Sequence, residues 1–323
     1  MLIDFAITNY RSIKDRQVFS MLTAGKVKEL PDNVAKIDKN INLLKSAVIY
    51  GRNASGKSNF LEAFYALRNM VDEPSEFRMN GALAFYEPFK LEANNLKMPV
   101  EFEINFIAEN KIKYNYHISF LEDKIVNESL YYFPNKVKAK LFIREAGKPI
   151  DFSDVIKGNK KQIEEYLYPH QLFLSMVGTY KIEQLIIPYQ YFEKSILLFD
   201  NGKDFSENLV SIVESDKAPF YKENLTKLLH IADTGIEGLV INKSKKTNSN
   251  PLSQLKVYEY EISTKHTFRK DGKKMNDIYM QLEEESEGTI KLLAIGGFIL
   301  DALNNGSVFI IDELKNSPLK IIV

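Results

Sequence analysis

The chain has 323 residues, a formal net charge of zero at pH 7 and no cysteine. The lack of cysteine excludes disulfides, thiolate metal sites and cysteine nucleophiles. The balanced charge excludes a field over the whole surface that would attract nucleic acid or anionic lipid. No segment reaches the ~18 apolar residues that span a bilayer, and Asp4 lies where a signal peptide would be basic. We therefore expect a cytoplasmic globular protein that makes no membrane contact.

The N-terminal part of the chain carries strand, turn and helix signals in turn. Residues 2–8 and 17–22 predict two strands, separated by the turn Asn9-Tyr10-Arg11-Ser12. The apolar run Ser46–Tyr50 is typical of a buried parallel strand. Apolar residues then recur at helical spacing from Asn59 to Val71, which predicts an amphipathic helix.

The middle of the chain alternates between apolar and polar residues and then becomes helical in pattern. The alternation predicts antiparallel strands at 100–107, 113–121, 125–133 and 139–144. Residues 154–231 favour helices interrupted by prolines. Near the end, the pattern predicts a helix at 288–303 and an apolar strand at 307–311.

These patterns predict an α/β fold in which the two ends of the chain build one nucleotide-binding core. We expect four parts: 1–74 as the first part of the core, 75–150 as a β lobe, 151–250 as a helical insertion or lid, and 251–323 as the second part of the core.

A glycine-rich loop is the strongest functional motif. It consists of Gly51, Arg52, Asn53, Ala54, Ser55, Gly56, Lys57 and Ser58. The pattern G-x4-G-K-[ST] between a strand and a helix is a P-loop, whose backbone N–H groups hold phosphates. Lys57 is predicted to reach the β- and γ-phosphates of ATP, and Ser58 to bind Mg²⁺.

Two carboxylates follow the predicted strand at 307–311. Asp312 and Glu313 would emerge at its C-terminal end, where open α/β sheets bind ligands. Asp312 is the candidate for holding Mg²⁺, and Glu313 is the candidate general base for the attacking water. A strand that ends in two solvated acids is the alternative, which the P-loop disfavours.

The segment Glu285-Ser286-Glu287-Gly288-Thr289 comes directly before the predicted helix at 288–303. Ser286 can cap this helix, so that the free N–H groups near Ser286 and Gly288 face outward. Such a helix start suits the γ-phosphate of a nucleotide held by another subunit. An ordinary capped helix is the alternative.

The order of these motifs resembles the AAA-type core ATPases of the SMC/RecF/ABC class, whose relatives include antiphage proteins of the OLD-like and abortive-infection types. The resemblance includes Asn9-Tyr10-Arg11-Ser12, the P-loop with Asn59, the Ser286 segment and Ile311-Asp312-Glu313-Leu314. It implies a P-loop NTPase like the ABC and SMC heads, and an ATP-sandwich homodimer in which the P-loop meets Ser286 and Gly288 of the other head. It also implies that Arg11 lies near the phosphates, and it points to antiphage defence with an effector protein.

Only ten residues follow Glu313, whereas the related heads continue with a further loop, helix, strand and switch histidine. We therefore expect a truncated, frameshifted or split protein that binds nucleotide and, on its own, hydrolyses ATP weakly or not at all. A non-hydrolysing nucleotide-binding or interaction module, or a remnant that needs a partner, remains the alternative to an ATPase switch.

Basic residues gather ahead of the Ser286 segment, at 243–246 and 265–274. A solvated loop and hairpin would account for them, and a contact with nucleic acid is the alternative. No aromatic platform interleaves with these basic residues beyond Phe268 and Tyr279.

Overall fold

The computed structural model describes residues 1–25, 30–39, 41–53, 55–72, 83–158, 160–199, 218–232, 234–245 and 258–311. The chain divides into two compact units, Met1–Ile196 and Leu197–Val323. The four-part division expected from the sequence stays a prediction. Among the described residues, no helix is long and apolar enough to cross a membrane.

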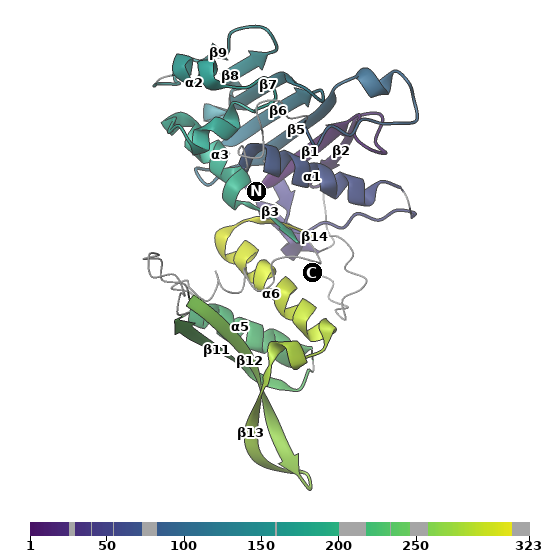
Figure 1. Ribbon diagram of the computed structural model, residues 1–323, viewed down its shortest axis with the longest axis vertical. Helices are drawn as coiled ribbons and strands as arrows, with labels where there is room; N and C mark the ends of the chain where they lie inside the picture. Colours follow the sequence, from purple (N-terminus) through teal and green to yellow (C-terminus); the bar gives the residue numbers. More distant parts are fainter. Residues whose placement is uncertain are drawn as a thin grey trace. The chain divides into compact units, whose positions relative to one another are not determined.

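A seven-stranded antiparallel sheet, in the order β2-β1-β5-β6-β7-β8-β9, forms the first unit (Figure 1). Its strands are β1 (Leu2–Thr8), β2 (Gln17–Ser20), β5 (Val100–Ile107), β6 (Lys113–Phe120), β7 (Ile125–Tyr132), β8 (Ala139–Glu145) and β9 (Asp151–Phe152). A separate pair is formed by β3 (Val34–Lys36) and β4 (Asn42–Leu44). The four strands predicted in the middle of the chain are confirmed, because β5 to β8 match their predicted bounds to within one residue.

Helices cover one face of this sheet (Figure 1). The helices are α1 (Lys57–Asp72), α2 (Lys160–Tyr166) and α3 (Glu183–Lys194), with 3₁₀ turns at Pro31–Asn33, Asn95–Lys97, Pro134–Lys136 and Leu174–Gly178. The fully buried ring of Phe5 lies 4.0 Å from that of Phe64 on α1, centre to centre. Phe106 stacks at 3.9 Å on Tyr191 of α3. Aromatic pairs of this kind add to the area that each ring buries, so they fix both helices on the sheet.

A buried ion pair ties the far edge of the sheet to the segment that follows it. Glu128 on β7 is fully buried and lies 3.5 Å from Arg144 on β8. Its carboxylate accepts hydrogen bonds from the Tyr116 hydroxyl at 2.9 Å and from the backbone N–H groups of Phe173 and Leu174 at 2.6 and 2.9 Å. Burial raises the pKa of Glu128, and the cation and these donors oppose that shift. The pair therefore depends on every partner being present.

The apolar segment Ser46–Tyr50 forms no strand, so the predicted buried parallel strand before the P-loop is wrong. Val48, Ile49 and Tyr50 are 61%, 38% and 86% exposed. Within the described residues no strand pairs with this segment. The segment is anchored at its start, where Asn33 exchanges hydrogen bonds with the Ser46 backbone N–H and carbonyl at 2.8 and 3.0 Å.

The second unit joins a three-stranded antiparallel sheet, in the order β11-β12-β13, to two helices (Figure 1). Its elements are α5 (Ala218–Ile231), β11 (Ile236–Lys245), β12 (Tyr258–Lys270), β13 (Lys273–Gln281), a 3₁₀ turn at Leu282–Glu284, α6 (Glu287–Asn305) and β14 (Val308–Ile311). Leucine and isoleucine side chains from α5, β11, the 3₁₀ turn and α6 form one buried core, made of Leu225, Leu229, Ile236, Leu239, Leu282, Leu292 and Leu293.

The predicted helix at 288–303 and strand at 307–311 are confirmed as α6 and β14. β14 forms a two-stranded sheet with β10 (Ile196–Phe199). β10 lies inside the stretch that was expected to be helical. A run of apolar residues there could form either element, and pairing with β14 decides the outcome.

Replacing Arg144 with methionine should lower the free energy of unfolding by about 3–5 kcal/mol, because Glu128 would stay buried without its cation. Urea unfolding followed by the near-ultraviolet circular dichroism of the tyrosines measures this. Lys148→Met, which removes the exposed Lys148–Glu145 pair, is the control and should cost less than about 1 kcal/mol. Equal unfolding midpoints for the two variants would contradict the assigned role of the buried pair.

Candidate nucleotide-binding site

The P-loop leads directly into helix α1, as its motif predicts. The first helical hydrogen bond runs from the Phe60 N–H to the Gly56 carbonyl at 3.0 Å. The N–H groups of Lys57, Ser58 and Asn59 therefore have no acceptor within the helix. Free N–H groups and the positive end of the helix dipole make this turn a site for an anion.

Both glycines of the loop stand where a side chain would collide. A Cβ on Gly56 would lie 2.7 Å from the Ser12 hydroxyl oxygen, and one on Gly51 would lie 2.6 Å from the Ser55 hydroxyl oxygen. Gly56 also has a φ of +92°, which other residues rarely adopt. Within the loop, the Ser55 N–H donates to the Arg52 carbonyl at 3.2 Å. The loop thus forms a narrow turn whose backbone can approach a phosphate group closely.

The Lys57 side chain folds back over its own loop. Its ammonium group donates to the carbonyls of Gly51 and Arg52 at 3.0 and 2.9 Å. The same cation could bind phosphate oxygens at this place, since an anion is a stronger acceptor than a carbonyl. Arg52, Asn53 and Ser58 are exposed, and Ala54 lies outside the described residues. The residues present therefore fit a nucleotide phosphate chain.

The turn Asn9–Ser12 lies against the start of α1. The Asn59 amide donates to the Ser12 hydroxyl at 2.7 Å, which is the hydroxyl that approaches Gly56. The N-terminal motif includes Ser12, but the sequence alone predicts no role for it. Its position in that motif was the available signal.

Arg11 is held by carboxylates. Its guanidinium group donates two hydrogen bonds to Glu87, both at 2.9 Å, and lies 3.7 Å from Glu62 on α1. The hydrogen bond with Glu87 raises the pKa of Arg11. The expected position of Arg11 near the phosphates stays a prediction, and the structure adds Glu87 as the residue that orients it.

Ser286 caps α6, as the sequence predicts. Its hydroxyl accepts the Thr289 N–H at 3.1 Å, and Gly288 lies in the first turn of the helix. The preceding residue, Glu285, bonds His266 on β12 at 2.7 Å and also Thr264. The N-terminus of this helix is therefore anchored to the sheet of its own unit, while Ser286 itself is exposed.

The remaining predicted site residues, Asp312 and Glu313, lie outside the described residues, which end at Ile311 of β14. The P-loop belongs to the first unit, and β14 and Ser286 belong to the second. The roles expected of Ser286, Asp312 and Glu313 at a nucleotide in the P-loop stay predictions.

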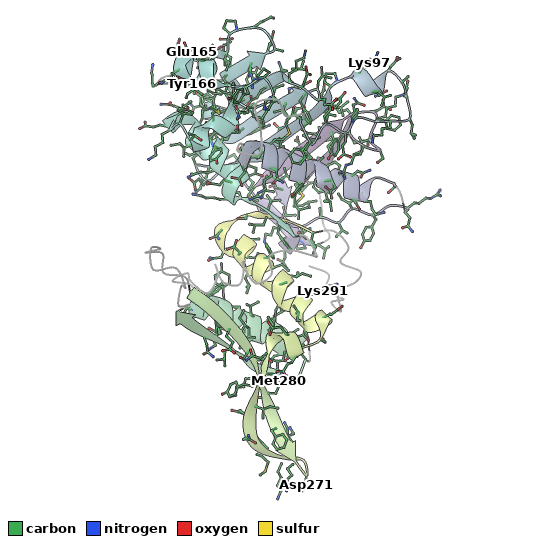
Figure 2. The ribbon with its side chains drawn as sticks, viewed as in Figure 1. Lys97, Glu165, Tyr166, Asp271, Met280 and Lys291 are labelled. Carbon is green, nitrogen blue, oxygen red and sulfur yellow. The ribbon has the colours of Figure 1, made fainter. Side chains whose placement is uncertain are left out.

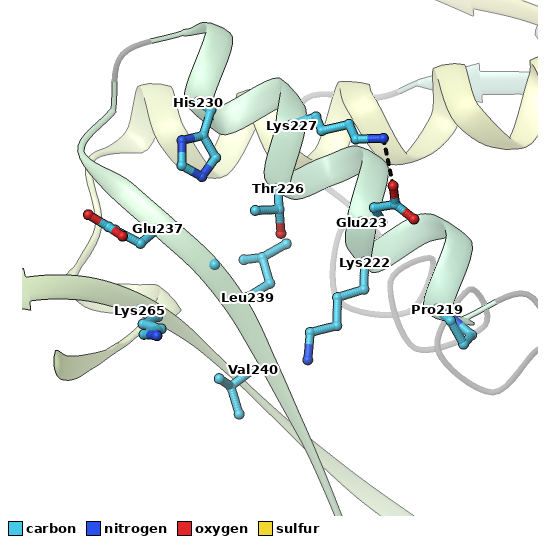
Figure 3. A pocket seen from close by; sticks show the side chains of 11 residues that line it. Pro219, Lys222, Glu223, Thr226, Lys227, His230, Glu237, Leu239, Val240 and Lys265 are labelled. Atoms are coloured by element: carbon cyan, nitrogen blue, oxygen red, sulfur yellow. Dashed lines mark hydrogen bonds and ion pairs between the residues drawn. The ribbon is translucent and has the colours of Figure 1, made fainter.

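A separate pocket of about 600 Å³ lies in the second unit between α5 and β11 (Figure 3). Lys222, Lys227 and His230 line it from α5, and Glu237 and Lys265 line it from the sheet. Two of its cations are already paired, Lys227 with Glu223 at 2.6 Å and Lys265 with Asp277 at 2.7 Å. None of the predicted nucleotide-binding residues lines this pocket, so it is distinct from the P-loop site.

Comparison with known proteins identifies one family. The sequence model of the family described as "AAA domain, putative AbiEii toxin, Type IV TA system" matches residues 46–317. This span includes the P-loop, the Ser286 segment and the Asp312-Glu313 pair. A search of curated proteins finds no match.

Solved structures with similarity to the chain include two of a recombination mediator. "Structure of the recombination mediator protein RecF-ATP in RecFOR pathway" is 13% identical, with a TM-score of 0.37, and the match covers 97% of this chain and 84% of that one. The corresponding RecF-ATPrS structure is 14% identical, with a TM-score of 0.38, over 97% and 85% of the two chains.

Replacing Gly56 with alanine should weaken ATP binding, because the new methyl group meets Ser12 and the φ of +92° becomes strained. Gly147→Ala is the matched control, since Gly147 also has a positive φ, of +75°, but has open space around its Cβ position. Both variants should lose about 1–2 kcal/mol of stability from the backbone strain. Only Gly56→Ala should lose affinity in an ATP titration, and adding Ser12→Gly should restore part of it. Equal ATP affinities for the two alanine variants would show that the close approach to Ser12 does not shape the loop.

Proposed function

This chain belongs to the AAA-domain family described as putative AbiEii toxins of type IV TA systems, and on that premise we propose that it binds ATP with Mg²⁺ at its P-loop and hydrolyses it. The observation that carries the proposal is the turn at Gly56. There the helix α1 presents free N–H groups, Lys57 reaches across the loop, and a Cβ at Gly56 would lie 2.7 Å from the Ser12 hydroxyl oxygen.

Backbone N–H groups and three side chains would hold the phosphates and the metal. The backbone N–H groups from Arg52 to Ser58 would surround the phosphates, and Lys57 would contact the β- and γ-phosphates. Ser58 and Asp312 would hold Mg²⁺, which when bound neutralises charge on those phosphates. The donor set fits this metal, because a hydroxyl and a carboxylate are oxygen ligands.

Hydrolysis would depend on Glu313. Its carboxylate would orient the attacking water and accept a proton from it while the bond between the β-oxygen and the γ-phosphorus breaks. ADP and inorganic phosphate would leave. The position of Glu313 directly after β14 supports this role, since ligands of α/β sheets bind beyond the C-terminal ends of strands.

ATP would also control assembly. In the proposed homodimer, the exposed helix start at Ser286 and Gly288 contacts the γ-phosphate held by the P-loop of a second copy. Free N–H groups at the start of α6 suit that oxygen-rich ligand. The family description supports a role in defence, in which ATP-dependent dimerisation acts on an effector protein or on nucleic acid. The cytoplasm is the proposed compartment.

Replacing Lys57 with alanine should weaken Mg-ATP binding by about 1.5–3 kcal/mol, a factor of roughly ten to a hundred, because a charge-assisted contact is lost. Isothermal titration with ATP, with and without Mg²⁺, measures this. Lys97→Ala, at an exposed position in the same unit, should bind as the wild type does. A Lys57→Ala protein with unchanged affinity would refute the P-loop assignment.

Replacing Glu313 with glutamine should leave ATP affinity unchanged and abolish turnover, because the amide cannot accept the proton of water. Phosphate release measures turnover, and light scattering tests whether ATP now traps a dimer. Glu283→Gln, an exposed change in the same unit, is the control. Turnover by Glu313→Gln at the wild-type rate would exclude Glu313 as the base. Binding without turnover by the wild type would favour a module that only binds nucleotide.

A further inference from the structure

The hairpin of β12 and β13 carries a basic exposed surface. Five lysines and arginines lie between Ser263 and Gln281, against two aspartates. Every residue from Phe268 to Asn276 is exposed. The strands meet at Asp271-Gly272, whose φ values of 49° and 77° form a tight two-residue turn. Figure 2 shows Asp271 at the tip and Met280 nearer the base of the hairpin.

Like charges face each other at this tip. Arg269 is directly opposite Lys274, and Lys270 is directly opposite Lys273. Opposed cations destabilise a strand pair. Lys274 is partly neutralised by Asp277 at 3.2 Å, but in the part of the chain that the structure describes Arg269, Lys270 and Lys273 form no ion pair. The free protein therefore keeps three unpaired cations together, an arrangement that an anionic partner would stabilise.

Aromatic rings lie just behind these cations. Phe268 is 46% exposed and Tyr279 is 59% exposed. Phe268 faces Asn276, while Tyr279 faces Lys265, so the rings lie on opposite faces of the two-stranded ribbon. Cations near exposed rings are the combination that binds single-stranded nucleic acid, because bases without a pairing partner can stack on the rings.

Two other roles explain the cations and rings of this hairpin less well than nucleic-acid binding does. They are protection against aggregation and insertion into a membrane. Lysines near a strand edge can prevent sheets from aggregating, but the exposed rings of Phe268 and Tyr279 would work against that protection. Insertion into a membrane would need apolar residues at the leading end, whereas the turn here is Asp271-Gly272 flanked by lysines.

We propose that the β12–β13 hairpin binds single-stranded nucleic acid. The cations at its tip contact phosphates, and Phe268 and Tyr279 stack on bases. This deepens the nucleic-acid part of the proposed function, but the contact itself requires no ATP.

The test is the binding of a fluorescent single-stranded DNA or RNA oligonucleotide to the full chain, measured by anisotropy across a range of salt. The variant Arg269→Gln/Lys270→Gln/Lys273→Gln should lose about tenfold or more in affinity, and its salt slope should fall by about two. The control Lys97→Gln/Lys111→Gln/Lys157→Gln removes three exposed cations from the first unit. It should keep the wild-type affinity and the wild-type salt slope. Equal affinity of the hairpin variant and wild type overturns the proposal.

The rings are tested separately. Phe268→Ala and Tyr279→Ala should each weaken binding by about fivefold to a hundredfold and leave the salt slope unchanged. Tyr166→Ala removes an exposed ring from the first unit and should have no effect. Tighter binding to duplex than to single strands would contradict the stacking of bases on the rings. Binding only to vesicles that contain phosphatidylserine would show that the partner is not nucleic acid.

An ATP titration of the same proteins separates the two proposals. The hairpin variants should bind ATP as wild type does, which also shows that they fold. If the wild type binds nucleic acid through the hairpin but binds no ATP, the proposed ATPase function fails and this inference stands. If the wild type binds ATP but not the oligonucleotide, the proposed ATP binding stands and this inference fails.

Discussion

The buried side chain of Asn9 holds the first unit together around its N-terminal turn. Its amide donates to the carbonyls of Asn95, Met98 and Pro99 at 3.0–3.2 Å and accepts from the Phe89 N–H and the Asn95 amide. Asn9 has a φ of 54°, a conformation that asparagine tolerates better than most residues. The Asn9 side chain thus provides hydrogen-bond partners for backbone groups of this loop that would otherwise be buried without one.

The same turn also reaches the nucleotide site. Ser12 contacts Gly56 and Asn59, and Arg11 binds Glu87, whose backbone carbonyl accepts the Arg11 N–H at 2.7 Å. The end of the P-loop therefore rests on a turn that is itself fixed by hydrogen bonds to the loop at 87–99. This is a physical reason for an Asn-Tyr-Arg-Ser motif to accompany a P-loop far from it in sequence. A ligand-binding loop must be held within a fraction of an ångström, and packed neighbours provide that support.

The net charge of this protein is zero, but its two units use charged side chains in different ways. In the first unit, Glu128 and Arg144 are buried and Glu128 accepts the N–H groups of Phe173 and Leu174, so the pair specifies how β7 and β8 hold the segment that follows. In the hairpin of the second unit, like charges face one another in solvent. The high dielectric constant of water weakens that repulsion, which allows a surface to keep cations available for a partner.

The sequence by itself determined the elements with a strong period and the motif with fixed spacing. Alternation located β5 to β8, helical spacing located α1 and α6, and the P-loop pattern located the turn at Gly56. These signals are local, because each depends on residues a few positions apart. Only the tertiary structure decided which strands pair: the apolar run Ser46–Tyr50 stays exposed, while β14 pairs with β10. Likewise only the fold brought Ser12 to Gly56 and Glu87 to Arg11, since contacts between residues more than forty positions apart leave no period in the sequence.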